Sequence, residues 1–242
     1  MLGVCNHRTM EVKTRMILEK FCPDCLWHMK AIPIEKLIEA FGIEIEYQYL
    51  TKDGRKILGK LICTDGVTPY YDIEQQEYLF LEVHANTIFV EARLLDQENQ
   101  GRYHFTLAHE LCHYLLNIEE VDNLELADLA NHNLSKIEKW CNDFAFYFIA
   151  GEYGNVIDRL EKANSLNDYN HEIVEEISKK THLSQIAIFT RLLLNNQISP
   201  KDYKNVKADF EEQFRLKQLE EQKNTKFKIE PWTKITDLHL LN

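Results

Sequence analysis

The sequence predicts an α+β fold, in which a small and mainly antiparallel sheet precedes a set of helices. Between residues 43 and 92, apolar and polar side chains alternate over short runs, as they do in half-buried strands. From residue 105 onwards, apolar side chains recur every three or four positions, which is the spacing of amphipathic helices. With 242 residues, 45% of them hydrophobic, the chain is long enough to bury a substantial core.

The individual elements follow from these patterns and from the turn residues between them. Helices are expected at residues 9–22, 34–41, from about 105, at 134–150, twice between 171 and 198, and at 201–223. Strands are expected at residues 43–50, 57–63, 78–83 and 87–92. Asp53 and Gly54 supply a turn between the first two strands, and residues 84–86 form a hairpin loop between the last two.

Residues 109–113, His-Glu-Leu-Cys-His, carry the strongest chemical signal in the chain. Residues four apart on a helix share one face, so the imidazoles of His109 and His113 can bind a single metal ion. Glu110 would then lie beside the ion, where a general base for an attacking water belongs. The helix is expected to start near Phe105, with Thr106 as its N-cap.

Two solvated histidines on an ordinary amphipathic helix are the alternative reading of this motif. Ala108, Leu111 and Leu115 flank the histidines and indicate a buried face. Uncoordinated imidazoles on such a face would need other polar partners, so a metal site is favoured.

A third protein ligand is expected from a later segment, because catalytic zinc has three protein ligands in most enzymes. Glu138 lies at the edge of the apolar face of the 134–150 helix, and Asn142 follows one turn later. From the pattern alone, Glu138 is equally compatible with a ligand and with a solvated boundary residue. Three other residues compete for the role: Glu125, Asp128 and His132. His132 is the strongest of these, although the residues around it indicate a turn.

Residues 102–116 and 138–145 resemble the two signature segments of the ImmA/IrrE metallopeptidases. The resemblance extends over about residues 30–195 and implies a zincin-like metalloprotease core, with the small sheet packed on the helix that carries the His-Glu motif. It also implies that an edge strand of the sheet binds substrate. Thr87–Ala92 is the candidate for that strand, and an interior position is equally compatible with its sequence.

Roles for individual residues are also implied by the resemblance. It makes His109, His113 and Glu138 the ligands of Zn²⁺, and Glu110 the catalytic base. Asn142 is then a supporting residue behind the ligands. Cys112 departs from the family pattern, which often has a small residue in the middle of the His-Glu motif. The oxyanion-stabilising donor stays open among Tyr103, His104, Tyr114 and Tyr147.

The chain is expected to divide into three parts. Residues 1–30 form an N-terminal segment with a Cys-x-x-Cys motif, residues 31–200 the zincin-like domain, and residues 201–242 a charged helix and tail. The helical patterns at 171–198 resemble a helix-turn-helix but lack a basic face, so a structural role in the domain is favoured.

Cys22 and Cys25 have the spacing of half a zinc site. Cys5, His7 and His28 lie near enough in the sequence to complete four ligands. Strong zinc ribbons contain two such cysteine pairs, and this segment has one. Free thiols are therefore the default expectation, and a structural metal at Cys22 and Cys25 is the alternative.

Composition limits the cellular setting and the partners. The net charge of −11 and the lack of a Lys/Arg cluster argue against direct binding of nucleic acid. No apolar run approaches the ~20 residues that cross a bilayer, so no membrane contact is expected. The N-terminus lacks the apolar stretch of a secretory signal, which predicts a cytoplasmic protein.

Together with the resemblance, these observations predict a zinc-dependent cytosolic endopeptidase. The resemblance implies that its substrate is a helix-turn-helix repressor of a phage, a mobile element or a stress regulon. A non-catalytic antirepressor, which contains zinc and sequesters the repressor, is the alternative. A zinc hydrolase of small molecules is a weaker one. Two imidazoles and a carboxylate also suit Mn²⁺ or Fe²⁺.

Overall fold

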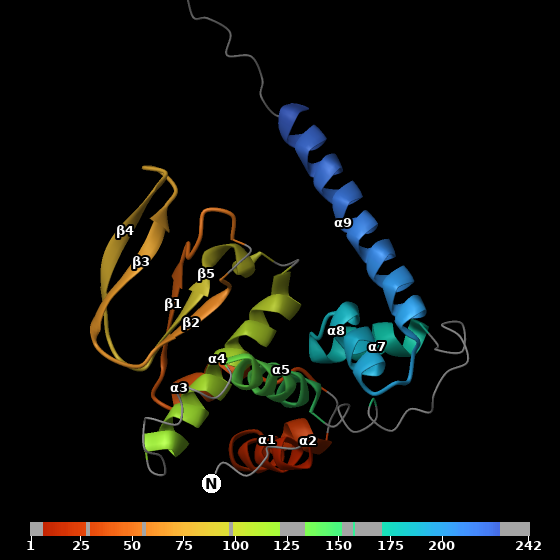
Figure 1. The fold of residues 1–242 in the computed structure, drawn as a ribbon, viewed down its shortest axis with the longest axis horizontal. Helices are drawn as coiled ribbons and strands as arrows, with labels where there is room; N and C mark the ends of the chain where they lie inside the picture. Colours follow the sequence, from red (N-terminus) through yellow and green to blue (C-terminus); the bar gives the residue numbers. More distant parts are fainter. Residues whose placement is uncertain are drawn as a thin grey trace, which may run out of the picture.

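The computed structural model describes residues 7–27, 30–54, 57–96, 99–121, 134–151, 157 and 171–227. Its elements are α1 (His7–Phe21), α2 (Asp24–Trp27), α3 (Ile34–Ala40), β1 (Glu44–Gln48), β2 (Gly59–Ile62), β3 (Gly66–Asp72), β4 (Glu77–Val83), β5 (Thr87–Glu91), a 3-10 turn η1 (Ala92–Leu95), α4 (Gln100–Val121), α5 (Leu134–Ala150), α7 (His171–Thr181), α8 (Gln185–Leu194) and α9 (Pro200–Phe227). The predicted α+β class is confirmed, and the strands lie together on one side of the helices (Figure 1).

The strands form a three-stranded sheet in the order β1-β5-β2 and a separate two-stranded ribbon of β3 and β4. β5 pairs with β1 in parallel and with β2 antiparallel, so the larger sheet is mixed, and the expected mainly antiparallel pairing holds for two of the three strand pairs. The expected hairpin between residues 78–83 and 87–92 is wrong, because β4 pairs with β3 instead. β3 was not among the expected strands.

β5 is the central strand of its sheet, so the expectation that Thr87–Ala92 forms a substrate-binding edge is wrong. Every residue of β5 is buried, including Thr87 and Glu91. A run of successive buried residues is typical of an interior strand, whereas an edge strand exposes alternate residues. β2 and β1 are the two edges of this sheet among the described strands.

α4 packs across the sheet and against α5, which places the His-Glu motif at the centre of the molecule (Figure 1). Leu107 and Leu111 are fully buried on one face of α4, and Ile88 and Val90 of β5 belong to the same core cluster. The expected helix start near Thr106 is wrong, since α4 already begins at Gln100. Thr106 is instead a buried residue inside the helix.

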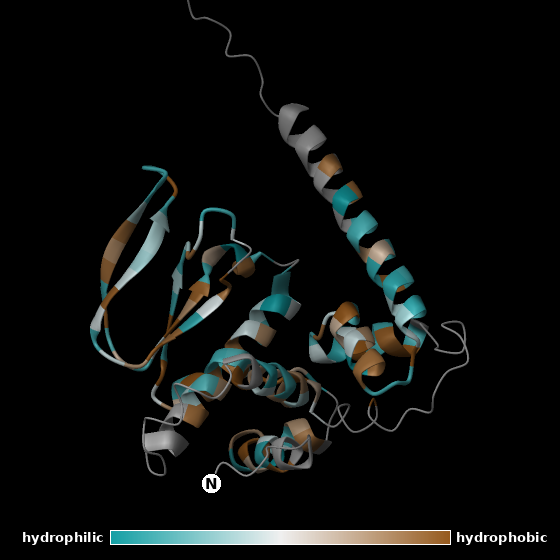
Figure 2. Cartoon of the chain, viewed as in Figure 1, coloured by the Kyte–Doolittle hydropathy of each residue, from teal (hydrophilic) through white to brown (hydrophobic). Residues whose placement is uncertain are grey.

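The remaining helices pack at different places: α3 packs on α4 and β1. α1 packs on α5, and α8 packs on the first turns of α9. α9 then extends away from the body and is largely hydrophilic along its described length (Figure 2). Among the described residues, no helix is both long and apolar enough to cross a membrane.

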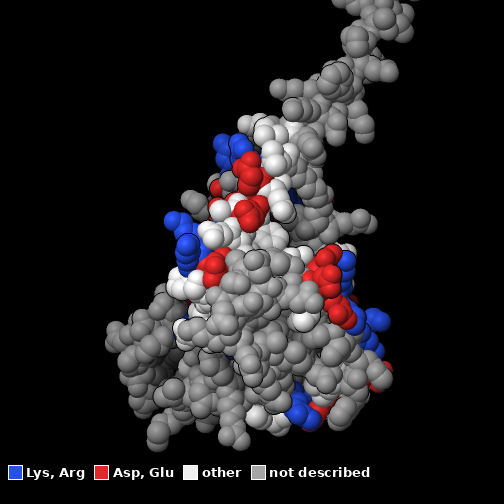
Figure 3. All heavy atoms as spheres, turned by 90° about the vertical axis from the view of Figure 1, so that its right-hand side faces the viewer, with Lys and Arg blue, Asp and Glu red and all other residues white. Residues whose placement is uncertain are grey.

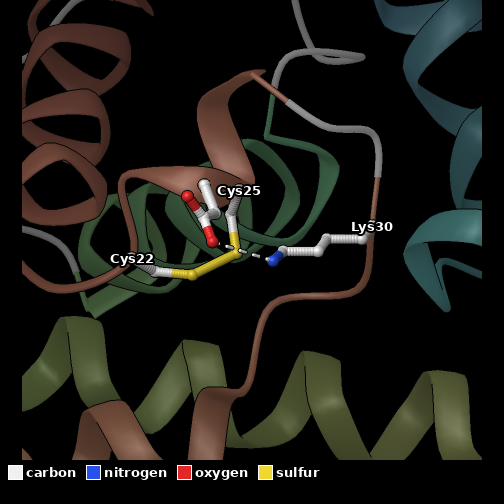
Figure 4. Close-up of a disulfide and its surroundings, with 4 residues drawn as sticks. Cys22, Cys25 and Lys30 are labelled. Carbon is white, nitrogen blue, oxygen red and sulfur yellow. Dashed lines mark ion pairs between the residues drawn. A yellow bond between two sulfur atoms is a disulfide. The ribbon is translucent and has the colours of Figure 1, made fainter.

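Cys22 and Cys25 are joined in a disulfide between α1 and α2, beside an ion pair of Asp24 and Lys30 (Figure 4). The bonded sulfurs offer no thiolate to a metal. Both expectations for Cys22 and Cys25 are therefore wrong in this structure: the residues are neither free thiols nor metal ligands. Cys5 and His28 lie outside the described residues.

Candidate metal centre

The two histidines of the motif lie on the face of α4 next to its buried leucines. Their side chains are only partly exposed, 14% for His109 and 24% for His113. The Nε2 atoms of the two rings are 3.1 Å apart. Burial is the largest cause that lowers the pKa of His109, which favours a neutral ring with a lone pair to donate.

Glu138 on α5 reaches both of these nitrogens. Its carboxylate oxygens lie 3.2 Å from Nε2 of His109 and 3.4 Å from Nε2 of His113. α5 places Glu138 there because Cys141, Phe144 and other residues of its apolar face are buried against the core. The structure thus brings together the three residues that were expected to be ligands. Glu125, Asp128 and His132, the competing candidates, lie outside the described residues.

The spacing of the three donor groups fits a small divalent cation. In a tetrahedral zinc site with bonds of about 2.0–2.1 Å, neighbouring ligand atoms are about 3.3–3.4 Å apart. The measured separations of 3.1, 3.2 and 3.4 Å lie close to that range. Two neutral imidazoles and one carboxylate are also the ligand types of catalytic zinc sites.

Asn142 fixes the orientation of the His109 ring. Its Oδ1 atom lies 3.1 Å from Nδ1 of His109. Nδ1–H is therefore the donor of this hydrogen bond, because a carbonyl oxygen only accepts, and Nε2 is left as the lone-pair nitrogen that faces Glu138. This is the supporting position expected for Asn142.

Glu110 points from α4 towards β2 and is almost completely buried, with 8% of the residue exposed. Burial raises the pKa of its carboxyl to about 7, and a backbone hydrogen bond with Leu61 acts in the opposite direction. A carboxyl group with a pKa near neutrality suits proton transfer at physiological pH. The burial and the raised pKa of Glu110 are properties that a general base requires.

The close approach of β2 to α4 depends on Gly59, which the sequence analysis missed. A Cβ atom at Gly59 would lie 2.5 Å from the methyl group of Thr106 and 2.8 Å from Oε1 of Glu110. The strand therefore passes over α4 at a distance that only glycine allows. A glycine inside a strand pattern is a known signal of close backbone approach, so the sequence did contain this information.

The outer edge of β2 faces the metal centre. Leu58 and Ile62 direct their carbonyl groups at β5, where they accept hydrogen bonds from Glu91 and Asn86. In an antiparallel ladder, alternate residues turn their backbone groups to opposite sides, so those of Gly59 and Leu61 point away from β5. This outward direction agrees with the hydrogen bond between Leu61 and Glu110.

These groups line one cleft of ≈ 690 Å³. β2 and its flanking residues form one wall, and side chains from α4 and α5 form the other. The lining includes His109, Glu110, His113, Glu138 and Asn142.

Cys141 is a further candidate ligand that the sequence analysis assigned only to the packing face of α5. Its sulfur and one nitrogen of each histidine all lie within 4.8 Å of one another. However, a hydrogen bond with Cys112 and burial raise the pKa of the Cys141 thiol, and zinc binds the thiolate. The contact with Cys141 also raises the pKa of His113. Glu138 is therefore the better third ligand, and Cys141 a partner of His113.

None of the four expected oxyanion donors lines the cleft as the structure describes it. Tyr103 shares a hydrogen bond of 2.9 Å with Tyr47, and His104 faces His182. The Tyr114 hydroxyl donates to the Phe41 carbonyl. Tyr147, the fourth, contacts Arg191. These side chains have structural partners, so the oxyanion donor is not assigned.

The α+β fold and the two-histidine, one-carboxylate site define a domain of the zincin-like metallopeptidase class. Residues 68–152 match the sequence model of the IrrE N-terminal-like domain of the M78 peptidases. The matched segment contains α4 and α5 but neither β2 nor α8. The family supports a peptidase-type hydrolase that uses a metal ion. No curated protein matches the chain.

Proposed function

We propose that this chain is a zinc-dependent endopeptidase. His109, His113 and Glu138 hold the ion, and Glu110 is the general base. One observation carries the proposal: two imidazole nitrogens and a carboxylate converge within 3.1–3.4 Å beside a buried glutamate. A metallopeptidase family match over the segment that contains these residues supports it.

Each residue has a separate task in the hydrolysis. When bound, a zinc ion would lower the pKa of a water molecule to about 7 and polarise the scissile carbonyl. Glu110 accepts a proton from the attacking water and passes it to the leaving amide nitrogen. The Leu61 amide holds the Glu110 carboxylate in place, and Asn142 holds the His109 ring.

The open edge of β2 favours a polypeptide substrate over a small molecule. An extended peptide can add to such an edge as a further strand, using backbone hydrogen bonds that do not depend on its sequence. The outward backbone groups of Gly59 and the outward carbonyl of Leu61 are at the wall of the cleft, whereas the Leu61 amide is already bonded to Glu110. A substrate peptide that lies along this edge passes the metal site, so cleavage at an internal peptide bond of the substrate is expected.

The family resemblance points to a helix-turn-helix repressor as the substrate, and to the cytosol as the place where it is met. On the described part of the face in Figure 3, basic and acidic side chains are intermixed, which favours a protein partner over nucleic acid. An antirepressor that sequesters the same repressor without cleaving it is the second candidate, since it would use the same fold.

The Glu110→Gln variant distinguishes the endopeptidase from the antirepressor. Zinc-loaded wild-type chain and this variant would be incubated with helix-turn-helix proteins encoded in the same genome, and fragments detected by mass spectrometry. We expect cleavage by the wild type and a loss of about 10²-fold or more in the variant, with unchanged zinc content. Glu39→Gln, an exposed position on α3, is the matched control. Relief of repression by the Glu110→Gln variant would favour sequestration instead.

A further inference from the structure

A second cavity of ≈ 660 Å³ adjoins the metal centre between α5 and α8. Three residues line both cavities: Phe105, Glu138 and Asn142. Glu138 is the proposed ligand, so the second cavity opens directly beside the ion site. Successive residues of an extended peptide are about 3.3 Å apart, so the side chain next to a bond at the metal can reach this cavity.

The cavity wall is mostly apolar. Phe105 and Phe146 contribute aromatic surface from α4 and α5, and Ala187 and Leu194 contribute aliphatic surface from α8. The α8 residues lie outside the segment that matches the family. This wall is therefore formed by a part of the chain that the family match does not include.

The one buried charge at the cavity is already neutralised. The Arg191 side chain is 3% exposed and lies 3.2 Å from the Asp143 carboxylate. Its guanidinium also contacts the Tyr147 hydroxyl and lies 4.5 Å from the centre of the Tyr147 ring. Because this charge is paired within the protein, Arg191 does not attract an acidic side chain. Lys139, the other cationic residue of the lining, is exposed to solvent, so its charge is screened.

We propose that this cavity is the main specificity pocket of the enzyme and receives a bulky apolar side chain, such as that of leucine, methionine or phenylalanine. The residue that carries this side chain adjoins the scissile bond. The inference rests on the proposed function, since it places the bond at the metal site. Ala187 then sets the size of the pocket from α8, and Leu194 contributes its apolar rim.

The test compares two hydroxamate-capped dipeptides that differ only in one side chain, leucine or alanine, next to the metal-binding group. Their binding to the zinc-loaded full chain is measured by calorimetry. The wild type should bind the leucine compound at least about tenfold more tightly, because several methylene and methyl groups leave water. In Ala187→Phe, the ring fills the pocket and this preference should fall below about threefold.

Two further variants keep the result interpretable. Ala208→Phe adds the same ring at an exposed position of α9 and should keep the wild-type preference. Leu194→Asp places a carboxylate at a position that is 56% exposed, where folding tolerates it, and should also reduce the preference. Zinc content and melting temperature are recorded for each variant.

The possible failures are distinguishable. Equal binding of the two compounds by the wild type would overturn the proposal that this cavity is the specificity pocket. An unchanged preference for the leucine compound in both Ala187→Phe and Leu194→Asp would also overturn it. In either case the hydroxamates still bind, so the proposed function stands. Failure of both compounds to bind the zinc-loaded chain would contradict the proposed function and the pocket together.

Discussion

Oδ1 of Asn142 and Nδ1 of His109 lie 3.1 Å apart, on the ring edge opposite the nitrogen that faces Glu138. The two residues belong to different helices, so this hydrogen bond links α5 to α4 behind the ligands. It sets the ring tautomer before any ion is bound.

Replacing Asn142 with alanine should therefore weaken metal binding without removing a ligand. We expect zinc affinity to fall by about 10- to 100-fold, as it does when such supporting hydrogen bonds are lost. Competition with a chromophoric chelator measures this directly. Asn142→Asp, which keeps an acceptor oxygen at the same place, should retain most of the affinity. Equal affinities in wild type and Asn142→Ala would contradict the role given to this residue.

Gly59→Ala should disturb the contact between β2 and α4. The added methyl group would lie 2.5 Å from Thr106 and 2.8 Å from Glu110, so the strand or the helix has to move. We expect a loss of about 1–3 kcal/mol in the free energy of unfolding, and reduced cleavage because Glu110 shifts. Urea denaturation and a peptide assay measure the two effects.

Matched variants identify the cause of that loss. Gly66→Ala adds the same methyl group on β3, where it meets no atom within 4 Å, and should be nearly neutral. Combining Gly59→Ala with Thr106→Ser removes the nearest methyl group and should restore part of the stability. If Gly66→Ala destabilised the chain as much as Gly59→Ala, close packing at Gly59 would not be the reason.

Burial of Glu110 should make the metal-free protein less stable as the pH rises. The folded state keeps the Glu110 proton up to about pH 7, whereas the unfolded chain releases it near pH 4.5. The cost of the buried carboxylate is thus absent below about pH 4.5 and complete above about pH 7. In Glu110→Gln this cost is removed, so the variant should gain about 3 kcal/mol over the wild type between these pH values.

Denaturation of both proteins in the presence of a chelator, at pH 4.5 and at pH 8, measures this difference. Ionisable groups that do not interact with Glu110 titrate equally in the two proteins and cancel in the comparison. A difference in unfolding free energy that stays constant with pH would show that the Glu110 carboxyl is not buried as described.

The parts of this site that depend on local sequence were predictable. His109 and His113 share a helix face because of their spacing alone, and the apolar pattern of α5 gave its bounds, Leu134–Ala150. Selecting Glu138 among its rivals required the family resemblance, because a carboxylate at the edge of an apolar face is equally consistent with solvation.

The pairing of strands was the least predictable part. β5 pairs with β1, more than forty residues earlier in the chain, and in parallel. Local turn signals favoured a hairpin of β4 and β5, and nothing in the short loop at residues 84–86 excludes it. The unbroken apolar run Ile88-Phe89-Val90 was the sign of an interior strand that the sequence offered, and the structure buries every residue of Thr87–Glu91. The contact between Cys141 and His113 could not be predicted from the sequence either, because it forms only when α4 and α5 pack together.

The metal content of two variants tests the central claim most directly. Wild-type, Glu138→Ala and Cys141→Ala proteins would be loaded with zinc, desalted and analysed by mass spectrometry for bound metal. The account predicts about one zinc ion per chain in the wild type and in Cys141→Ala, and a large loss in Glu138→Ala. A chain that keeps its zinc without Glu138 but loses it without Cys141, or a wild type that retains no metal, would contradict the account.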